Sequence, residues 1–376
     1  MIDSEIVVGT GLRITVARDD LAARLATVAR GVSTRTAVLV LGGIQLRAEA
    51  GRLHLAATDM EVSLRSSLEA QVSEEGTVVV PGRLLLDIAR SLPDAEVSIE
   101  HRPEEAVVVV SSGTATYRLH TYSAEDFPRL PDVDSVALQT VERDALVDTV
   151  ARVGRSASRD ESRPVLTGIL VRFEPGRIVM AATDSYRLAV KETPVSTSLP
   201  ELDAIIPARA LQELSRIATG VGEVQLGLHD NHVIFGADGT WLTTRRIDGQ
   251  FPNYRQLLPE QFEHEVVLPR EETLEVVRRV SLMAQRNSPL RLRFAAGELT
   301  VSAVTQDIGE ARESLPAPYT GEPMEIGFNA EFLRDGLDSV ESDSVKLKLI
   351  SPLRPAVLEG ESADYVYLIM PIRLAG

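Results

Sequence analysis

The spacing of apolar positions predicts a chain built from alternating strands and short helices. Segments such as "VSLRSSLEA" and "VVVVSSGTATYRLHTY" have a period of two, which is typical of strands that bury one face. Elsewhere apolar residues recur at i, i+4 and i+7, which places them on one face of a helix. Three such triplets are Leu21, Leu25 and Val28; Leu146, Val150 and Val153; and Leu333, Leu337 and Val340. We therefore predict amphipathic helices that lie against sheets.

Short glycine-containing turns connect many of the predicted strands. The segments "EPGR" and "AAGE" each join two strand patterns, and such turns favour antiparallel hairpins. The elements then recur in the order strand, helix, three strands, strand, helix, three strands. Two helices would cover one face of each sheet, which predicts an α+β architecture with antiparallel sheets.

This order of elements is repeated along the chain. "AATD" follows a predicted strand at residues 56–59 and again at 181–184, and "LTVSAVTQD" is a weaker third copy. The repeat markers are Thr58, Thr183 and Thr305 at steps of 125 and 122; Pro81, Pro207 and Asn329 at steps of 126 and 122; and Phe127-Pro128 and Phe251-Pro252 at a step of 124. We therefore predict three tandem, similar domains, at residues 1–134, 135–260 and 261–376.

Composition limits the class of protein. Apolar residues make up 44% of the chain, and the absence of cysteine excludes disulfides and thiolate metal sites. The first residues carry neither a basic segment nor a long apolar run, and no stretch approaches the roughly 18 apolar residues of a membrane span. We expect a soluble, unexported protein.

Charge is unevenly distributed along the chain. The net charge of −16 argues at face value against a protein that holds nucleic acid by bulk charge. Five of the six predicted helical segments are nevertheless basic, and only residues 331–344 are acidic, at −4. Helices on one shared surface would make it electropositive and suited to phosphate contacts that do not read bases. The alternative is that these arginines are ordinary solvated residues of surface helices.

Candidate catalytic and metal-binding residues are few. Asp59 and Asp184 occupy the same turn of different repeats and should lie far apart, so a strand-ending turn is the favoured interpretation. His229 and His232 have a metal-like spacing but no third ligand nearby. The chain also lacks a GxxxxGK[ST] phosphate loop and a G-x-S-x-G elbow. We predict a protein that is not an enzyme and has no cofactor or metal.

Several longer motifs resemble a known family. The segments "SRPVLTGILVRF", "AATDSYRLAV", "DGQFPNYRQLLP", "MEIGFN" and "YLIMPIRL" are similar to those of the bacterial DNA polymerase III β subunit, the sliding clamp, and the resemblance covers nearly the whole chain. It implies the DNA-clamp fold, with antiparallel sheets outside and two helices per domain facing a central channel. It also implies a head-to-tail dimer that closes into a ring around duplex DNA.

The resemblance further implies a peptide-docking cleft between the second and third domains. Leu, Ile, Pro and Met side chains would form an adaptable apolar groove for short extended peptides, with Thr183 and two arginines as polar anchors at its rim. The residues carried over by motif are Leu166, Thr183, Ser185, Tyr186, Arg187, Leu188, Pro252, Leu257, Leu353, Pro355, Ile369, Met370, Pro371, Ile372 and Arg373. Without the resemblance, a buried terminal strand is the favoured interpretation of "YLIMPIRL".

Two further sets of residues complete the prediction. Motif matches and local charge assign Arg35, Arg152, Arg163, Arg209 and Arg279 to the DNA-facing surface. The motif matches and charge complementarity assign Tyr117, Leu282, Asp307 and Glu310 to the dimer interface.

The resemblance also implies a set of partners and a location. The partners would be the replicative polymerase, the clamp loader, repair polymerases, ligase and mismatch-repair proteins, recruited through short hydrophobic peptides to a cytoplasmic, nucleoid-associated clamp. Two other hypotheses stay open, namely a scaffold that displays peptide grooves without DNA and an enzyme at a repeat interface.

Overall fold

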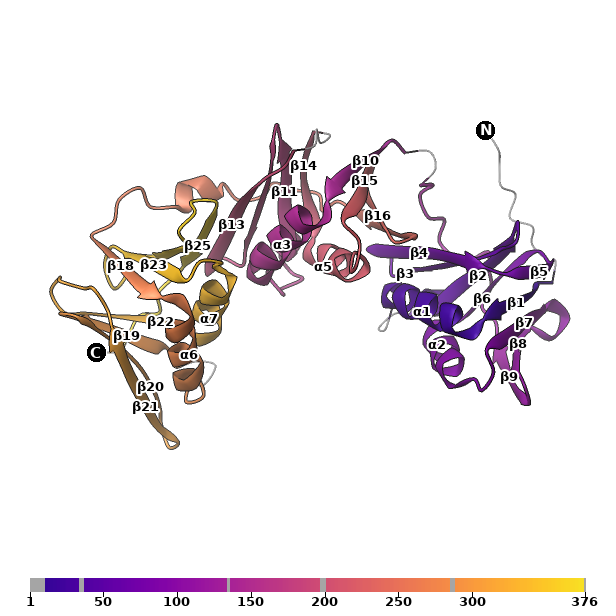
Figure 1. Cartoon of the computed structure of the whole chain (residues 1–376), viewed down its shortest axis with the longest axis horizontal. Coiled ribbons are helices and arrows are strands. Elements are labelled where there is room, and N and C mark those ends of the chain that lie inside the picture. Colours follow the sequence, from indigo (N-terminus) through magenta and orange to yellow (C-terminus); the bar gives the residue numbers. More distant parts are fainter. Residues whose placement is uncertain (1–10, 34–36, 134–135, 197–200, 285–287, 375–376) are drawn as a thin grey trace. The chain divides into compact units, whose positions relative to one another are not determined.

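The computed structural model describes residues 11–33, 37–133, 136–196, 201–284 and 288–374. Its elements follow the predicted order in the first repeat, with one additional strand, β5 (Figure 1). The first-repeat elements are β1 (Arg13–Ala17), α1 (Arg18–Val28), β2 (Gly43–Glu49), β3 (Arg52–Thr58), β4 (Val62–Glu69), β5 (Gln71–Glu74), β6 (Gly76–Pro81), α2 (Gly82–Ser91), β7 (Glu96–Arg102), β8 (Val107–Ser112) and β9 (Ala115–His120).

The second repeat has the same order, with a short additional helix, α4, before its second strand. Its elements are β10 (Leu138–Glu142), α3 (Arg143–Val153), α4 (Pro164–Thr167), β11 (Gly168–Glu174), β12 (Arg177–Thr183), β13 (Arg187–Pro194), β14 (Leu202–Pro207), α5 (Ala208–Ile217), β15 (Glu223–His229), β16 (His232–Ala237) and β17 (Thr240–Arg245).

The third repeat matches the predicted order without additions. Its elements are β18 (His264–Pro269), α6 (Arg270–Ser281), β19 (Leu290–Ala295), β20 (Glu298–Thr305), β21 (Gly309–Pro316), β22 (Met324–Phe328), α7 (Ala330–Ser339), β23 (Ser344–Leu349), β24 (Ala356–Glu359) and β25 (Tyr365–Ile369).

The markers that reveal the repeat also have a local structural role. Pro81 and Pro207 end β6 and β14 directly before α2 and α5, where a fixed proline φ suits the entry into a helix. Asn329 stands at the same place before α7, and its side chain accepts a hydrogen bond from the Phe332 amide at 3.1 Å.

The chain forms two compact units, residues Met1–Arg143 with Glu213–Arg246 and residues Asp144–Gln212 with Ile247–Gly376. The first contains a five-stranded sheet, β5-β1-β7-β8-β9, and an eight-stranded sheet, β10-β15-β16-β17-β4-β3-β2-β6. All of its strand pairs are antiparallel. The larger sheet is continuous across a repeat border, because β17 of the second repeat pairs with β4 of the first, from Thr240 opposite Ser66 to Thr244 opposite Val62.

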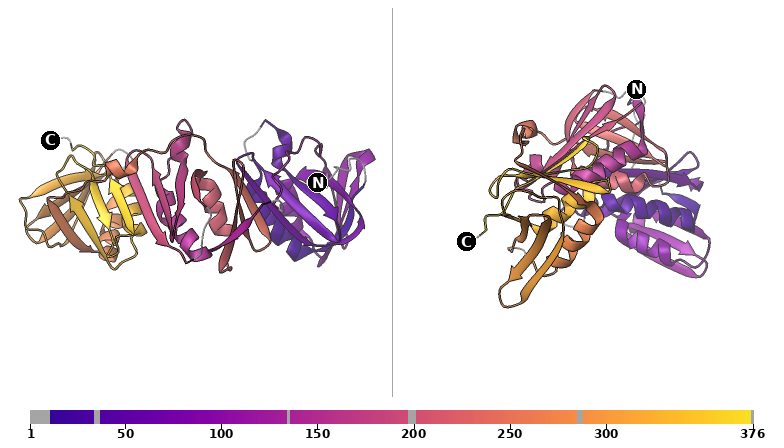
Figure 2. Two further views of the ribbon diagram at one scale, coloured as in Figure 1. Left: turned by 90° about the horizontal axis from the view of Figure 1, so that it is seen from above. Right: turned by 60° about the vertical axis from the view of Figure 1, so that its left-hand side comes forward.

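The second unit repeats this construction. Its sheets have the orders β14-β11-β12-β13-β25-β24-β23-β18 and β21-β20-β19-β22. Here β13 of the second repeat pairs with β25 of the third, from Arg187 opposite Ile369 to Lys191 opposite Tyr365, and Figure 2 shows the yellow β25 beside the strands of the second repeat. The domain borders at 134/135 and 260/261 remain predictions.

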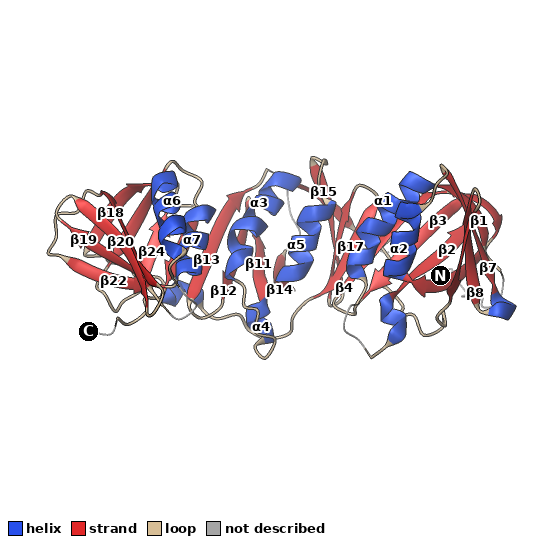
Figure 3. Cartoon of the chain, turned by 90° about the horizontal axis from the view of Figure 1, so that it is seen from below, coloured by secondary structure: helices blue, strands red, loops and turns tan. Residues whose placement is uncertain are grey.

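The helices bury the faces that their apolar spacing predicts. Leu21, Leu25 and Val28 of α1 are fully buried and share one core cluster with Leu85 of α2 and with the inner faces of both first-unit sheets. Figure 3 shows α1 and α2 side by side across these strands. The triplets on α3 and on α7 with its C-cap are also buried, which confirms the predicted amphipathic faces.

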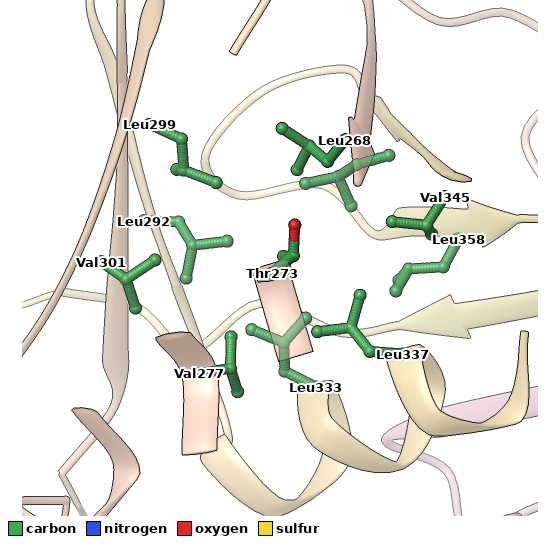
Figure 4. Close-up of a pocket in the computed structure, with 11 residues that line it drawn as sticks. Leu268, Thr273, Val277, Leu292, Leu299, Val301, Leu333, Leu337, Val345 and Leu358 are labelled. Carbon is green, nitrogen blue, oxygen red and sulfur yellow. The ribbon is translucent and has the colours of Figure 1, made fainter. Parts of the chain in front are cut away.

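The third repeat encloses a small void in its core. The space measures about 10 Å³ and lies between α6, α7 and the strands of two sheets, so it is too small and too apolar to hold a ligand (Figure 4). Its lining is Leu268, Thr273, Val277, Leu292, Leu299, Val301, Leu333, Leu337, Val345, Leu347 and Leu358. The Thr273 hydroxyl is satisfied by donating to the Pro269 carbonyl at 2.6 Å.

Candidate functional site

The repeated Thr-Asp sequence forms the same tight turn in the first two repeats. The Asp59 carboxylate accepts hydrogen bonds from the Glu61 and Val62 amides, and Asp184 accepts them from the amides of Tyr186 and Arg187. The residue two positions after the threonine has a left-handed backbone in all three repeats, with φ of 77° at Met60, 80° at Ser185 and 64° at Asp307. The prediction of a strand-ending turn is confirmed, because the carboxylates are bound by their own turns.

In the second repeat this turn lies beside the C-terminal segment. The Met370 amide donates to the Tyr186 carbonyl at 2.8 Å, directly beyond the ladder between β13 and β25. Two residues later the Ile372 amide donates to the Gly327 carbonyl at 2.7 Å. The predicted cleft residues 185–186 and 370–372, far apart in sequence, are thereby brought together.

The linker after the second repeat packs near the same place. Phe251 and Leu258 are partly buried against a cluster that contains Leu188 and Leu368, which anchors the linker to the eight-stranded sheet. Tyr186, which is bonded to Met370, is 61% exposed, and Leu353, three residues before the Ala356–Ile369 pair, is 65% exposed. The other accessible apolar residues of the predicted set are Pro252, Leu257, Met370 and Ile372. A cluster of exposed apolar side chains at one junction is typical of a docking surface.

Four predicted cleft residues do not present their side chains to solvent. Leu188 and Ile369 are buried in the sheet. Thr183 is buried as well, and its hydroxyl donates to the Arg187 carbonyl at 2.7 Å. The expectation that Thr183 and Arg187 are anchors at the rim is therefore wrong. The Thr183 hydroxyl is bound within the turn, and the Arg187 guanidinium is bound by the internal carboxylates Asp184 and Asp335.

The remaining predicted residues lie at intermediate or exposed positions. Leu166 and Pro355 are half-buried, as is Pro371, whereas Ser185 and Arg373 are exposed. Ser185 is also held by its neighbour, since Arg163 donates to its hydroxyl at 3.1 Å. Arg163, predicted to face DNA, thus contacts the turn of the candidate cleft.

Arg187 points away from solvent toward α7. Its Nε atom donates to Asp184 at 3.0 Å and its Nη1 atom to Asp335 at 2.6 Å, and the side chain is only 7% exposed. The guanidinium carbon also lies 4.2 Å from the centre of the Phe332 ring. Burial disfavours the charge, but the tyrosine and carboxylate partners outweigh it and raise the pKa of Arg187 above its usual value.

The predicted DNA-facing arginines are mostly engaged with carboxylates. Arg35 lies outside the described residues. Arg152 forms an ion pair with Glu341 and donates to the Ser339 carbonyl at 2.6 Å, so its charge is engaged within the chain, and its contact with DNA stays a prediction. Arg279 binds Glu313 at 2.6 Å, and this hydrogen bond lowers the pKa of the Glu313 carboxyl. Arg209 is exposed on α5.

The acidic segment 331–344 now has a structural explanation. On α7, Asp335 pairs with Arg187, while Asp338 pairs with Arg155 and lies 3.5 Å from Arg278. Its carboxylates are therefore the counter-charges of arginines on neighbouring elements of the second unit. Residue counts along single helices could not reveal this, since the pairs join residues up to 189 positions apart.

Two of the four predicted dimer residues lie on open sheet edges. Tyr117 lies on β9, the edge strand of the five-stranded sheet, and Glu310 lies on β21, the edge of the four-stranded sheet. Leu282, at the C-cap of α6, is 84% exposed. Val304 and Ile308, which the sequence reasoning missed, are also exposed near Asp307, and the Thr305 hydroxyl between them donates to the carbonyl of Met283, the neighbour of Leu282. The sequence signal that could have revealed this surface is the pair of apolar residues, Val304 and Ile308, on either side of the polar turn.

The alternative chemical sites find no support in the described part of the chain. His229 and His232 face each other across the β15–β16 hairpin, with Asp230 3.7 Å from His229. No group of three or more His, Cys, Asp or Glu side chains that could hold a metal ion occurs among the described residues. Within the same residues, no helix is long and apolar enough to cross a membrane.

Comparison with known proteins gives the family. Three family models, described as the N-terminal, central and C-terminal domains of the DNA polymerase III beta subunit, match residues 12–131, 140–253 and 255–373. The beta sliding clamp of Streptomyces coelicolor is 38% identical over 379 residues, covering 97% of this chain and 100% of that protein.

Solved structures give the same result. The DNA polymerase sliding clamp of Bacillus subtilis superposes with a TM-score of 0.90 at 26% identity, covering 97% of this chain and 100% of that one. A sliding clamp of Pseudomonas aeruginosa bound to griselimycin has a TM-score of 0.87 at 29% identity, with coverage of 97% and 100%. The fold, the two exposed surfaces and these matches together show that the chain belongs to the DNA polymerase III β subunit family, the β sliding clamps.

Proposed function

We propose that this DNA sliding clamp docks its partners at the junction of its second and third repeats. As a β sliding clamp, the protein is a non-catalytic processivity factor that encircles duplex DNA as a ring and tethers the replicative polymerase inside the cell. The observation that carries the docking proposal is the 2.8 Å hydrogen bond from Met370 to Tyr186, which places exposed apolar side chains of two distant segments at one junction.

The chemistry of this surface favours short extended peptides with large apolar side chains. Tyr186, Leu257, Leu353, Met370 and Ile372 offer accessible apolar area, and methionine adapts its shape to different partners. The buried residues Thr183, Arg187, Leu188 and Ile369 support this surface from beneath. Partners in this proposal are the replicative polymerase, the clamp loader, repair polymerases, ligase and mismatch-repair proteins, and the Pseudomonas complex makes griselimycin a further candidate ligand.

Mutation of the docking surface gives a direct test. We expect Leu353→Asp to weaken binding of a polymerase-derived peptide by about tenfold or more, because a charge replaces an apolar contact. Val267→Asp on β18 is the matched control, since Val267 is also an exposed apolar residue but lies outside the proposed surface. Equal peptide affinities of the two variants, measured by fluorescence anisotropy, would contradict the proposed location.

Ring closure is proposed to join the two open sheet edges. A head-to-tail contact between β9 of one chain and β21 of its partner would extend both sheets and remove two exposed edges. Tyr117 would then meet the apolar surface of Leu282, Val304 and Ile308, with Asp307 and Glu310 at its polar border. The proposed location of the closed ring is the nucleoid in the cytoplasm.

Topological retention distinguishes a clamp from a surface binder. The labelled protein is loaded by its cognate clamp loader onto closed circular DNA, which is then cut once. Loss on cutting, with retention on intact circles at the same salt concentration, is the expected result, because a ring slides off a linear end. Equal retention on both forms would favour ordinary surface binding or a scaffold that does not encircle DNA.

A further inference from the structure

The turn at residues 183–187 is fixed on its inner side by a single arginine. Ser185 and Tyr186 are exposed, whereas the next residue, Arg187, sends its side chain to the opposite side and is almost fully buried. Asp184 accepts three hydrogen bonds in this turn, from the amides of Tyr186 and Arg187 and from the Arg187 Nε atom. The side chain of Arg187 therefore closes the turn that displays Tyr186.

The same arginine connects this turn to α7. Its Nη1 atom donates to Asp335 at 2.6 Å, and the guanidinium lies over the Phe332 ring. The Phe332 carbonyl in turn accepts a hydrogen bond from the Tyr367 hydroxyl at 2.8 Å. Tyr367 is on β25, three residues before Met370.

These contacts form a closed path around the back of the junction. Arg187 joins the turn to α7, Tyr367 joins α7 to β25, and the Met370 amide joins the end of β25 to the Tyr186 carbonyl. Both segments that expose apolar side chains are thus connected to one helix, α7. A planar guanidinium can bind two carboxylates and stack on a ring at once, which an ammonium cannot do.

We infer that Arg187 is a positioning residue of the docking surface, which acts through Asp335 and Phe332 of α7 to set where Tyr186 and Met370 present their side chains. This inference rests on the proposed docking function. Substitutions at Phe332 or Asp335 of α7 would then change the affinity for partner peptides without touching the peptide. A role in direct peptide contact is inconsistent with the 7% exposure of the Arg187 side chain.

The test compares two carboxylates of α7. Asp335→Asn removes the 2.6 Å counter-charge of Arg187 together with a longer, 3.8 Å pair to Arg155. Asp338→Asn is the matched control, because its partners are the same Arg155 and Arg278. The probe is a fluorescein-labelled peptide that copies the clamp-binding segment of the cognate replicative polymerase. We expect about tenfold weaker binding for Asp335→Asn and less than a twofold change for Asp338→Asn.

Two further readouts separate positioning from general stability. The conservative variant Asp335→Glu should recover most of the lost affinity. Amide hydrogen exchange at Tyr186 and Met370 should accelerate in Asp335→Asn but not in Asp338→Asn, at a temperature where all variants are folded. Arg187→Lys, which keeps the charge but loses the planar fork, should bind peptide as weakly as Asp335→Asn.

The possible outcomes are distinct. Wild-type affinity in Asp335→Asn, or equal losses in both asparagine variants, would overturn the positioning role while leaving the docking proposal intact. Failure of the wild-type protein to bind the peptide would overturn the docking proposal and this inference with it. If Arg187→Lys does not fold, the two asparagine variants still decide the question.

Discussion

Met60 and Ser185 occupy equivalent positions of two repeats, where the backbone conformation is the same but the side chains differ. Both residues have φ near 80° at the same position of their turns, in a region that side chains with a Cβ atom rarely adopt. Ser185 belongs to the proposed docking surface of the second repeat. Met60 is 64% exposed, so its side chain gains little from packing to offset the strained backbone.

Replacement of Met60 by glycine should therefore stabilise the protein. We expect Met60→Gly to raise the free energy of unfolding by about 1 kcal/mol, because glycine adopts a positive φ without steric cost. The neighbouring Glu61→Gly is the matched control and should lower that free energy by about 0.5–1 kcal/mol through chain entropy. Urea unfolding measures the free energy of unfolding of both variants. A destabilised Met60→Gly variant would mean that contacts of the Met60 side chain stabilise the fold by more than the strained backbone costs.

Arg152 tests whether a basic residue of a helix contacts DNA or another part of the protein. Its side chain is 16% exposed and paired with Glu341 and the Ser339 carbonyl. We expect Arg152→Ala to lower the free energy of unfolding by about 1–3 kcal/mol while leaving the affinity for short duplex DNA unchanged. Arg209 lies at an exposed position of α5. We expect Arg209→Ala to weaken DNA binding and to reduce the slope of log affinity against log salt concentration by about 1, the value for one phosphate contact. A loss of DNA affinity in Arg152→Ala would support the predicted DNA contact of that residue.

At the scale of elements, local sequence patterns predicted the order of helices and strands along the chain but not which strands pair with each other. The triplets such as Leu21, Leu25 and Val28 predicted buried helix faces because an apolar spacing acts within one helix. The pairing of β17 with β4 joins residues about 180 positions apart, and an alternating strand pattern does not specify its neighbour. For the same reason, the partners of Arg152 and Arg187 were beyond sequence reasoning, although Arg187 belongs to a motif and Arg152 to a locally basic helix.

The void in the third repeat provides a test at the level of packing. Val301 on β20 lines it, and Figure 4 shows its side chain among the lining residues. We expect Val301→Ile to raise the free energy of unfolding by up to about 1 kcal/mol, since one extra methylene enters existing space. Val266→Ile on β18 is the control, because Val266 is fully buried but does not line the void, and there overpacking should cost about 1–3 kcal/mol. Thermal unfolding that ranks the two variants in the opposite order would contradict the assigned void.

At the scale of the whole molecule, the proposed seam of the ring would use residues that are exposed in a single chain. Leu282 is 84% exposed at the end of α6, so an aspartate there should leave the folded monomer intact. We expect Leu282→Asp to weaken the dimer by about a hundredfold, since a charge would be buried against an apolar partner surface. Leu84→Asp on α2 is the control for an exposed leucine away from the proposed seam. Analytical ultracentrifugation measures the dimer dissociation constant of both variants. An unchanged constant in Leu282→Asp would mean that the seam lies elsewhere on the chain.

The sheets that cross repeat borders have a mechanical consequence for loading. Five consecutive register pairs join β17 to β4, and five join β13 to β25, so parting either border would require peeling a whole strand from its neighbour. The outer sides of β9 and β21 have no partner strand among the described residues, because each strand ends its sheet. A loader that opens the ring at the proposed seam would leave every sheet within each chain intact, whereas opening at either repeat border would break one.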